Sequence, residues 1–286
     1  MDCINITAHA KINLTLSVLG RRADGYHELD TIMHTISLAD SVEMAKADQL
    51  SLFIEEGTAP AGKENLMMRA AVLFFEETGI RGGAAMRLWK RIPTEAGLGG
   101  GSADAAAVLR GLNRLYGSPF SLSELAKCAA TIGADVPFCV MGGAARCLGI
   151  GEIMTPLPAW EGLSLLIVRP DVSVSTKEAY AALDRSGGER RNKTDAAEKA
   201  LREQNFPALA ASLSNDFESA LFPSTPVLAE TAAELKKWGF PTMMTGSGSA
   251  FFVFVPPERR EGMRKEILRQ HPDWYAEAAE TVSARP

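Results

Sequence analysis

A glycine-dense stretch from Pro93 to Ala106 has the residue types of a phosphate-binding loop. Four of its glycines lie within positions 97–101, where the missing β-carbons let the backbone adopt positive φ and approach a ligand closely. Apolar residues recur at helical spacing after Ala103, which predicts a buried helix with Ser102 as its N-cap. Free backbone N–H groups and the positive end of the helix dipole would meet at this loop, which favours phosphate binding over a merely mobile loop.

The loop differs from the common nucleotide-binding patterns. A P-loop needs Lys followed by Ser or Thr after its last glycine, whereas Ser102 and Ala103 follow Gly101 here. The dinucleotide pattern would need a third glycine at position 102. We therefore expect a triphosphate cradle of backbone and helix end, with the reacting side chains supplied by other segments.

Two other segments offer such side chains. Lys11 and Asn13 share the polar face of a strand predicted from Lys11 to Val18, whose other face is apolar. Asp135 lies between Gly133, which is expected to end a helix, and Pro137, which favours an extended residue before it. A carboxylate held in this way suits a general base, although Asp in a short turn often only caps that turn. The residues alone leave both interpretations of Asp135 open.

The composition is that of an ordinary globular protein. The 286 residues carry a net charge of −5, with 46% hydrophobic and 23% charged residues. The acidic balance argues against general nucleic-acid binding, and no apolar run approaches the roughly 18 residues that a membrane helix needs. The four cysteines and four histidines lack metal-ligand spacing, so we expect reduced cysteines and no metal site in the protein. These features predict a cytoplasmic protein without nucleic-acid or membrane partners. A monomer or weak homodimer is expected, although composition does not determine the oligomeric state.

The order of predicted elements indicates an α+β protein of two domains, because strands dominate early and helices later. The Pro-Leu-Pro-Ala-Trp segment at 156–160 is the candidate boundary, which gives domains at residues 1–158 and 159–286. Asn65 is a predicted N-cap, Ser121 begins a capping box, and residues 185–193 are expected to form a solvated loop. Further strands are predicted near 31–38, 41–46, 49–55, 84–91, 163–168 and 243–255, and later helices near 175–184, 194–202, 225–238 and 258–270.

Four more stretches join the glycine loop to make a family pattern. They are Ala10–Leu14 (AKINL), Gly20–Glu28 (GRRADGYHE), Gly133–Phe138 (GADVPF) and Thr245–Ala250 (TGSGSA). In this order and spacing the chain resembles the GHMP kinases, which phosphorylate small-molecule alcohols with ATP. The resemblance implies the two-domain GHMP-kinase fold of α+β class, with an N-terminal ribosomal-protein-S5-like domain and a C-terminal α/β sandwich domain.

The resemblance also implies roles for single residues. Asp135 would take the proton of the substrate hydroxyl, while Lys11 keeps Asp135 ionised and counters the phosphate charge. The GRRADGYHE loop narrows the substrate to a cytidine-containing alcohol, with Tyr26 and Tyr180 stacked on the two faces of the base and His27 bonded to its edge. Asn13 and Thr176 would complete the substrate site. ATP would be bound by Asn65, Lys90, Pro93, Thr94, Glu95, Ala96, Gly97, Leu98, Gly99, Gly100, Gly101, Ser102 and Ala103. Mg²⁺ would arrive with ATP and stay bound mainly through phosphate oxygens and water.

Two other functions compete with this one. A GHMP kinase for another alcohol, such as homoserine or mevalonate, would not need a tyrosine–histidine loop facing a second tyrosine. A non-catalytic nucleotide-binding or RNA-associated module is the alternative from another class. The Lys11–Asp135 pair and the acidic net charge argue against such a module.

Overall fold

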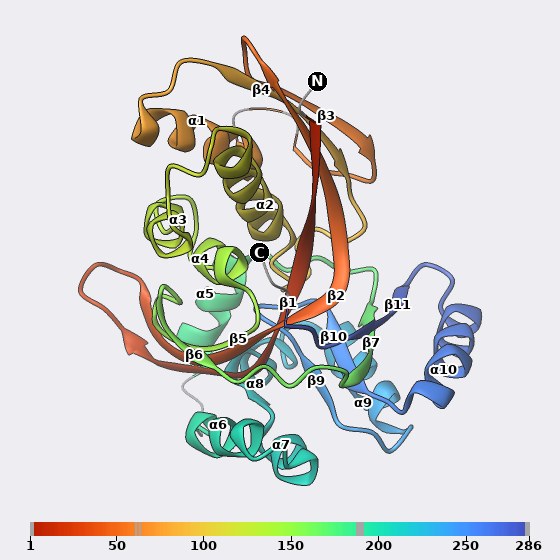
Figure 1. Ribbon diagram of the computed structural model, residues 1–286. Coiled ribbons are helices and arrows are strands. Elements are labelled where there is room, and N and C mark those ends of the chain that lie inside the picture. The colour runs from red at the N-terminus through yellow and green to blue at the C-terminus, as the bar shows by residue number, and fades with distance from the viewer. Residues whose placement is uncertain (1–2, 61, 63, 187–191, 284–286) are drawn as a thin grey trace.

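Two long antiparallel strands, β1 (Cys3–Arg21) and β2 (His27–Ala47), run through both lobes of the molecule (Figure 1). They belong to a computed structural model that describes residues 3–60, 62, 64–186 and 192–283. The expected alternation along β1 is present, but its polar face is buried as well: Lys11 and Asn13 are 3% and 1% exposed. Both faces are covered because helices pack on one side and the second lobe packs on the other.

The first lobe is built on a seven-stranded sheet with the order β3-β4-β2-β1-β8, in which β5 also pairs with β2 and β6. Four helices lie on one side of β1 and β2 (Figure 1): α2 and α4 contact these strands, and α1 and α3 pack against α2. The strands are β3 (Ser51–Glu56), β4 (Gly83–Trp89), β5 (Ala144–Gly149), β6 (Ile153–Leu157) and β8 (Ser214–Asn215). The helices are α1 (Leu66–Thr78), α2 (Gly100–Leu115), α3 (Leu122–Ala129) and α4 (Val136–Met141).

The second lobe contains a four-stranded antiparallel sheet with the order β11-β7-β10-β9. The short strand β8 comes from this half of the chain but pairs in parallel with β1, which joins the lobes. The strands are β7 (Ser164–Arg169), β9 (Thr242–Met244), β10 (Phe251–Phe254) and β11 (Tyr275–Glu280). The helices are α5 (Thr176–Ser186), α6 (Thr194–Arg202), α7 (Phe206–Ser212), α8 (Asp216–Leu221), α9 (Pro226–Lys236) and α10 (Pro257–Gln270).

Local capping signals predicted two helices, whereas the helix end expected at Gly133 and the extended residue expected before Pro137 were wrong, because α3 ends at Ala129 and Val136 begins α4. The Asn65 side chain accepts the Met67 N–H, and Gly79 closes the same helix in the left-handed conformation. Ser121 and Glu124 form the reciprocal capping box. The prediction for Ser102 was wrong, because α2 already begins at Gly100 and Gly99 is its N-cap.

Predictions that depended on strand length or on short segments were less accurate. The strands expected at 31–38 and 41–46 are one strand, β2, in which Asp40 is buried. Its carboxylate accepts the N–H groups of Arg91 and Ile92 and binds Lys90, so partners from another segment satisfy it inside the sheet. The sequence did not predict β5, β6, β8, β11, α4, α7 or α8. Of the expected loop at 185–193, residues 187–191 lie outside the described residues, and α5 extends to Ser186.

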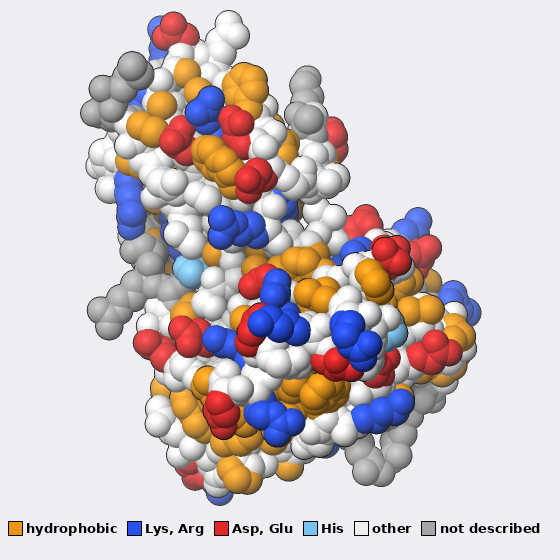
Figure 2. Space-filling model, turned by 90° about the vertical axis from the view of Figure 1, so that its right-hand side faces the viewer, with side chains coloured by type: hydrophobic (Ala, Val, Ile, Leu, Met, Phe, Trp, Pro, Cys, Tyr) orange, Lys and Arg blue, Asp and Glu red, His pale blue; other side chains and the backbone are white. Residues whose placement is uncertain are grey.

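The charged surface of the face in Figure 2 mixes signs, with basic side chains interspersed among acidic ones. Among the described helices, none combines the length and apolar character needed to cross a membrane.

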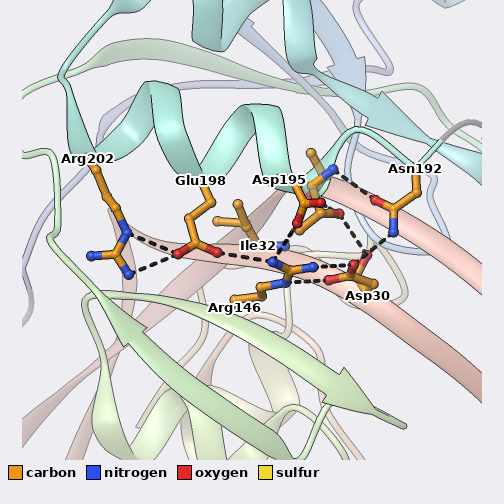
Figure 3. Close-up of polar contacts among 9 residues, drawn as sticks. Asp30, Ile32, Arg146, Asn192, Asp195, Glu198 and Arg202 are labelled. Atoms are coloured by element: carbon orange, nitrogen blue, oxygen red, sulfur yellow. Dashed lines mark hydrogen bonds and ion pairs between the residues drawn. The ribbon is translucent and has the colours of Figure 1, made fainter.

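An ion-pair cluster around Arg146 joins α6 to the sheet (Figure 3). The Arg146 guanidinium makes two hydrogen bonds to Asp30 on β2, at 2.9 and 2.7 Å, and also binds Asp195 and Glu198 on α6. Bonding to Asp30 is the main cause that raises the pKa of Arg146. The Asp30 side chain is only 4% exposed, so the guanidinium is its main countercharge.

Replacement of this arginine should destabilise the fold. In Arg146→Leu the buried Asp30 carboxylate loses its guanidinium, and we expect the free energy of unfolding in urea to fall by about 3 kcal/mol. Arg202→Leu is the matched control, because Arg202 is 47% exposed and its ion pair is with Glu198 of the same helix, which predicts a loss within about 1 kcal/mol. Equal losses in the two variants would contradict a structural role for the Arg146 cluster.

Candidate active site

The glycine loop presents uncapped backbone N–H groups at the start of α2. Gly99 has a φ of 68° and, as glycine, has no side chain with which to cap the helix. The first helical bond runs from the Ala103 N–H to the Gly99 carbonyl at 2.8 Å. The N–H groups of the preceding three residues therefore have no partner within the helix, which suits them to a phosphate group.

The Thr245–Ala250 motif supports the glycine loop from the second lobe. The Ala250 N–H donates to the Ala96 carbonyl at 3.1 Å. Gly97 has a φ of 73°, and a β-carbon added to it would lie 2.1 Å from the Thr245 carbonyl oxygen. The two segments are thus in backbone contact, which requires glycine at this position.

Lys90 borders the cavity, and its ammonium is paired with two carboxylates beneath the loop. It binds Asp40, and it binds Asp104 on α2 at 2.9 Å, with all three side chains at most 4% exposed. These pairs support the start of α2, and the contact of Lys90 with adenosine stays a prediction. Burial raises the pKa of Asp104 to about 7, and Oδ1 of its carboxyl has no hydrogen-bond partner among the described residues.

This raised pKa predicts a pH-dependent stability. A carboxyl group with an ordinary pKa of 3.8 when unfolded and about 7 when folded holds its proton more tightly in the fold. The protonated Asp104 therefore contributes fully to the free energy of unfolding below pH 3.8, and this contribution is lost as the pH rises to about 7. Between these pH values the free energy of unfolding falls by up to about 1.4 kcal/mol per pH unit. Asp104→Asn removes the titrating group, so urea unfolding from pH 4 to 8 should show a steeper decline in the wild type than in this variant. Parallel pH curves would contradict the assignment.

Lys11 and Asp135 form an ion pair in the wall of a cavity, with Nζ and Oδ2 3.5 Å apart. Lys11 Nζ also donates to Asn13 Oδ1 at 2.7 Å, and Asn13 donates to Thr31 Oγ1 at 2.8 Å. Asn13 is therefore enclosed and orients Lys11. Asp135 occupies the N-cap position of α4, but within the described chain its side chain makes no capping hydrogen bond. This geometry argues against a capping role and leaves the carboxylate available to a ligand.

Nearly all the predicted site residues line one cavity of about 870 Å³. Lys11, Asn13, Asp135 and loop residues 93–102 line it together with Asn65 and Lys90, and Tyr26, His27, Thr176 and Tyr180 line its other part. Ala103 does not line the cavity and is packed in the core instead. Asn65 borders the cavity, but its amide is engaged in local bonds to Met67 and Pro60.

At the end of the cavity lined by Tyr26, His27 and Tyr180, two of these rings stack on each other, which the sequence did not indicate. His27 stacks on Tyr180 with ring centroids 4.5 Å apart and planes 17° apart. Tyr26 is 60% exposed at the tip of the β1–β2 hairpin. Burial, together with the charge of Asp135, raises the pKa of Tyr180 to about 12, so its hydroxyl stays neutral. The stacking of a base between the two tyrosines stays a prediction.

Other residues line the cavity that the sequence did not assign to the site, among them Arg21, Asp104, Lys177 and Asp184. Asp184 had a usable signal, because it follows Tyr180 by one helical turn. Ser247 of the TGSGSA motif also lines the cavity. Among the described residues there is no cluster of three or more His, Cys, Asp or Glu side chains suited to a metal ion.

Comparison with known proteins decides the family. Residues 65–143 match the GHMP kinases N terminal domain, and residues 197–273 match the GHMP kinases C terminal domain. The chain belongs to the GHMP kinase family. It is accordingly an ATP-dependent kinase of small molecules, with the two-domain GHMP kinase fold.

Individual relatives of this GHMP kinase are similar over most of their length. The 4-diphosphocytidyl-2-C-methyl-D-erythritol kinase of Caldicellulosiruptor saccharolyticus is 43% identical over 250 residues, which are 86% of each chain. The enzyme of that name from Acetivibrio thermocellus is 37% identical over 284 residues, covering 99% of this chain and 100% of its own.

Solved structures agree with this relationship. A crystal structure of 4-(cytidine 5'-diphospho)-2C-methyl-D-erythritol kinase superimposes with a TM-score of 0.82 at 36% identity, covering 98% of this chain and 100% of its own. A homoserine kinase from Cytophaga hutchinsonii has a TM-score of 0.77 at 18% identity, covering 99% and 95%, and therefore shares the fold alone.

Proposed function

We propose that this GHMP kinase transfers the γ-phosphoryl group of ATP to the 2-hydroxyl of 4-diphosphocytidyl-2-C-methyl-D-erythritol, in the non-mevalonate route to isoprenoid precursors. The observation that carries the chemistry is the Lys11–Asp135 pair, which faces the cavity beside uncapped N–H groups of the glycine loop. The similarity to kinases of that name supports the choice of substrate.

The geometry supports a direct transfer. Asp135 takes the proton of the 2-hydroxyl as its oxygen forms a bond to the γ-phosphorus, and the bond from that phosphorus to the β,γ-bridging oxygen breaks to release ADP. Lys11 lies 3.5 Å from Asp135, where its charge favours the ionised carboxylate and offsets the charge on the phosphoryl oxygens. The glycine loop binds the phosphates through backbone N–H groups.

We further propose a metal ion, a cellular compartment and an oligomeric state for this kinase. Mg²⁺ would reach the site on the phosphates of ATP, since phosphate oxygens and water are its usual ligands. The cytoplasm is the proposed compartment, because all four cysteines lie in the described chain and are free thiols. A monomer or weak homodimer without nucleic-acid partners fits the enclosure of the cavity within one chain.

Product analysis tests the proposed substrate. Purified protein is incubated with Mg·ATP and either the diphosphocytidyl alcohol, homoserine or mevalonate, and ADP release is measured together with ³¹P NMR of the product. We expect rapid ADP release and a new phosphomonoester signal with the diphosphocytidyl alcohol alone. Turnover of homoserine or mevalonate in its place would reject the substrate while leaving the kinase assignment intact.

Tyr26 should contribute to binding of the cytidyl group. Its exposed ring borders the cavity, so Tyr26→Ala should weaken binding of the diphosphocytidyl substrate by about 5- to 150-fold, the value of one stacked base. Tyr26→Phe keeps the ring and should bind nearly as the wild type does. Phe53→Ala is the control, because Phe53 is 57% exposed on β3 and does not line the cavity. Calorimetry with the substrate and with ATP checks both effects; equal affinity in Tyr26→Ala and wild type excludes the stacking role.

A further inference from the structure

The imidazole of His27 makes two contacts with one face of α5. Its ring stacks on Tyr180, and its Nε2 lies 2.7 Å from Asp184 Oδ1. Tyr180 and Asp184 are four residues apart on α5, so both side chains project from the same face of that helix. The stack fixes the plane of the ring and the carboxylate fixes its rotation within that plane.

The contact with Asp184 also determines which ring nitrogen carries the proton. An ionised carboxylate can only accept a hydrogen bond, so His27 Nε2 must donate. In a neutral imidazole the other nitrogen, Nδ1, then carries a lone pair and acts as an acceptor. Throughout residues 3–60, 62, 64–186 and 192–283, Nδ1 has no hydrogen-bond partner, and it is not among the fully enclosed polar atoms without one. His27 lines the cavity, so this acceptor is open to a bound ligand.

We propose that Asp184 determines base specificity by holding His27 as an acceptor that selects the 4-amino group of cytosine. Uracil has a carbonyl oxygen at that position, and two acceptors facing each other leave both unpaired. The inference rests on the proposed function, because the base is that of the cytidyl substrate. His27 already covers one face of Tyr180, so a base paired with the edge of His27 would lie beside the imidazole, nearly parallel to both rings.

The position of Asp184 makes a test by substitution practical. Its side chain is 40% exposed, so Asp184→Ala removes the acceptor without opening the core. We expect the wild type to bind cytidine diphosphate at least about tenfold more tightly than uridine diphosphate, and Asp184→Ala to lose most of that ratio. Affinity for ATP should not change, because the glycine loop lies apart from this contact. Asp171→Ala is the matched control, since it removes an exposed carboxylate shortly before α5 that does not line the cavity.

A second measurement determines which ring nitrogen of His27 carries the proton. Long-range ¹H–¹⁵N NMR of the imidazole nitrogens at pH 8, with His27→Gln used to assign the signal, should show the Nε2–H form in the wild type. The same signal should shift toward a mixture of tautomers in Asp184→Ala. A wild-type ring protonated at Nδ1 would overturn the proposal.

The binding results separate this inference from the proposed function. A wild type that binds neither pyrimidine diphosphate rejects the substrate, and the specificity role is rejected with it. A wild type that prefers cytidine diphosphate, with the same preference in Asp184→Ala, leaves the substrate standing and rejects only the role of Asp184.

Discussion

Asp135→Asn should lower kcat by about 10²- to 10⁴-fold, the range for loss of a general base. The amide keeps the size of the side chain but cannot take the proton of the substrate hydroxyl. Steady-state ADP release at saturating ATP and diphosphocytidyl substrate measures the loss. Because the uncapped N–H groups of α2 remain, we expect the affinity for ATP to stay close to that of the wild type.

Two comparisons separate chemistry from folding in this variant. The thermal midpoint should fall, because the Lys11 side chain is only 4% exposed and loses its carboxylate partner, so kcat is measured well below the midpoint of the variant. Asp273→Asn is the control, an exposed carboxylate in the turn before β11. Near-wild-type turnover of a folded Asp135→Asn protein would reject the base assignment.

Gly99→Ala should reduce kcat/KM by about 10-fold. A β-carbon at this position would lie 3.0 Å from Lys11 Cγ and 3.2 Å from Lys11 Cε, so the lysine that faces Asp135 must shift by a few tenths of an ångström. Because a misplacement of about 1 Å costs about 10²-fold in rate, this smaller shift should cost less. The new side chain would also strain a backbone with a φ of 68°, which costs about 1–2 kcal/mol of stability.

Gly117→Ala separates the two effects of that substitution. Gly117 follows α2, has a φ of 86°, and has no described atom within 4 Å of an added β-carbon. Both variants should therefore lose similar free energy of unfolding, while only Gly99→Ala loses activity. If kcat/KM is unchanged in Gly99→Ala, the contact between this position and Lys11 has no catalytic importance.

Interactions among residues close in sequence could be predicted without the structure. The cap at Asn65 and the capping box at Ser121 depend on backbone and side-chain atoms within three residues, so their patterns are complete in the sequence. The glycine loop likewise carries its own signal. The Lys11–Asp135 assignment depended on the family resemblance, because neither residue alone separates a reacting group from a solvated lysine or a turn cap.

Ser102 shows the limit of a local signal. A serine just before a helical pattern predicts an N-cap, yet the left-handed Gly99 begins α2 earlier. Contacts with Thr245 and Gly246 from the second lobe hold the neighbouring loop backbone, and they do not appear in any short window of sequence. Packing between the lobes therefore decided where this helix begins.

The sequence by itself determined the family, and through the family pattern it indicated the candidate reacting groups and the phosphate loop. Only the tertiary structure decided how these groups are held: Lys90 against Asp40, His27 against Asp184, and the Asn13 N–H against Thr245 Oγ1, which are separated by 50, 157 and 232 residues. The physical reason is that a buried polar group must find a partner at hydrogen-bond distance, and that partner is whichever group the packed chain brings near it.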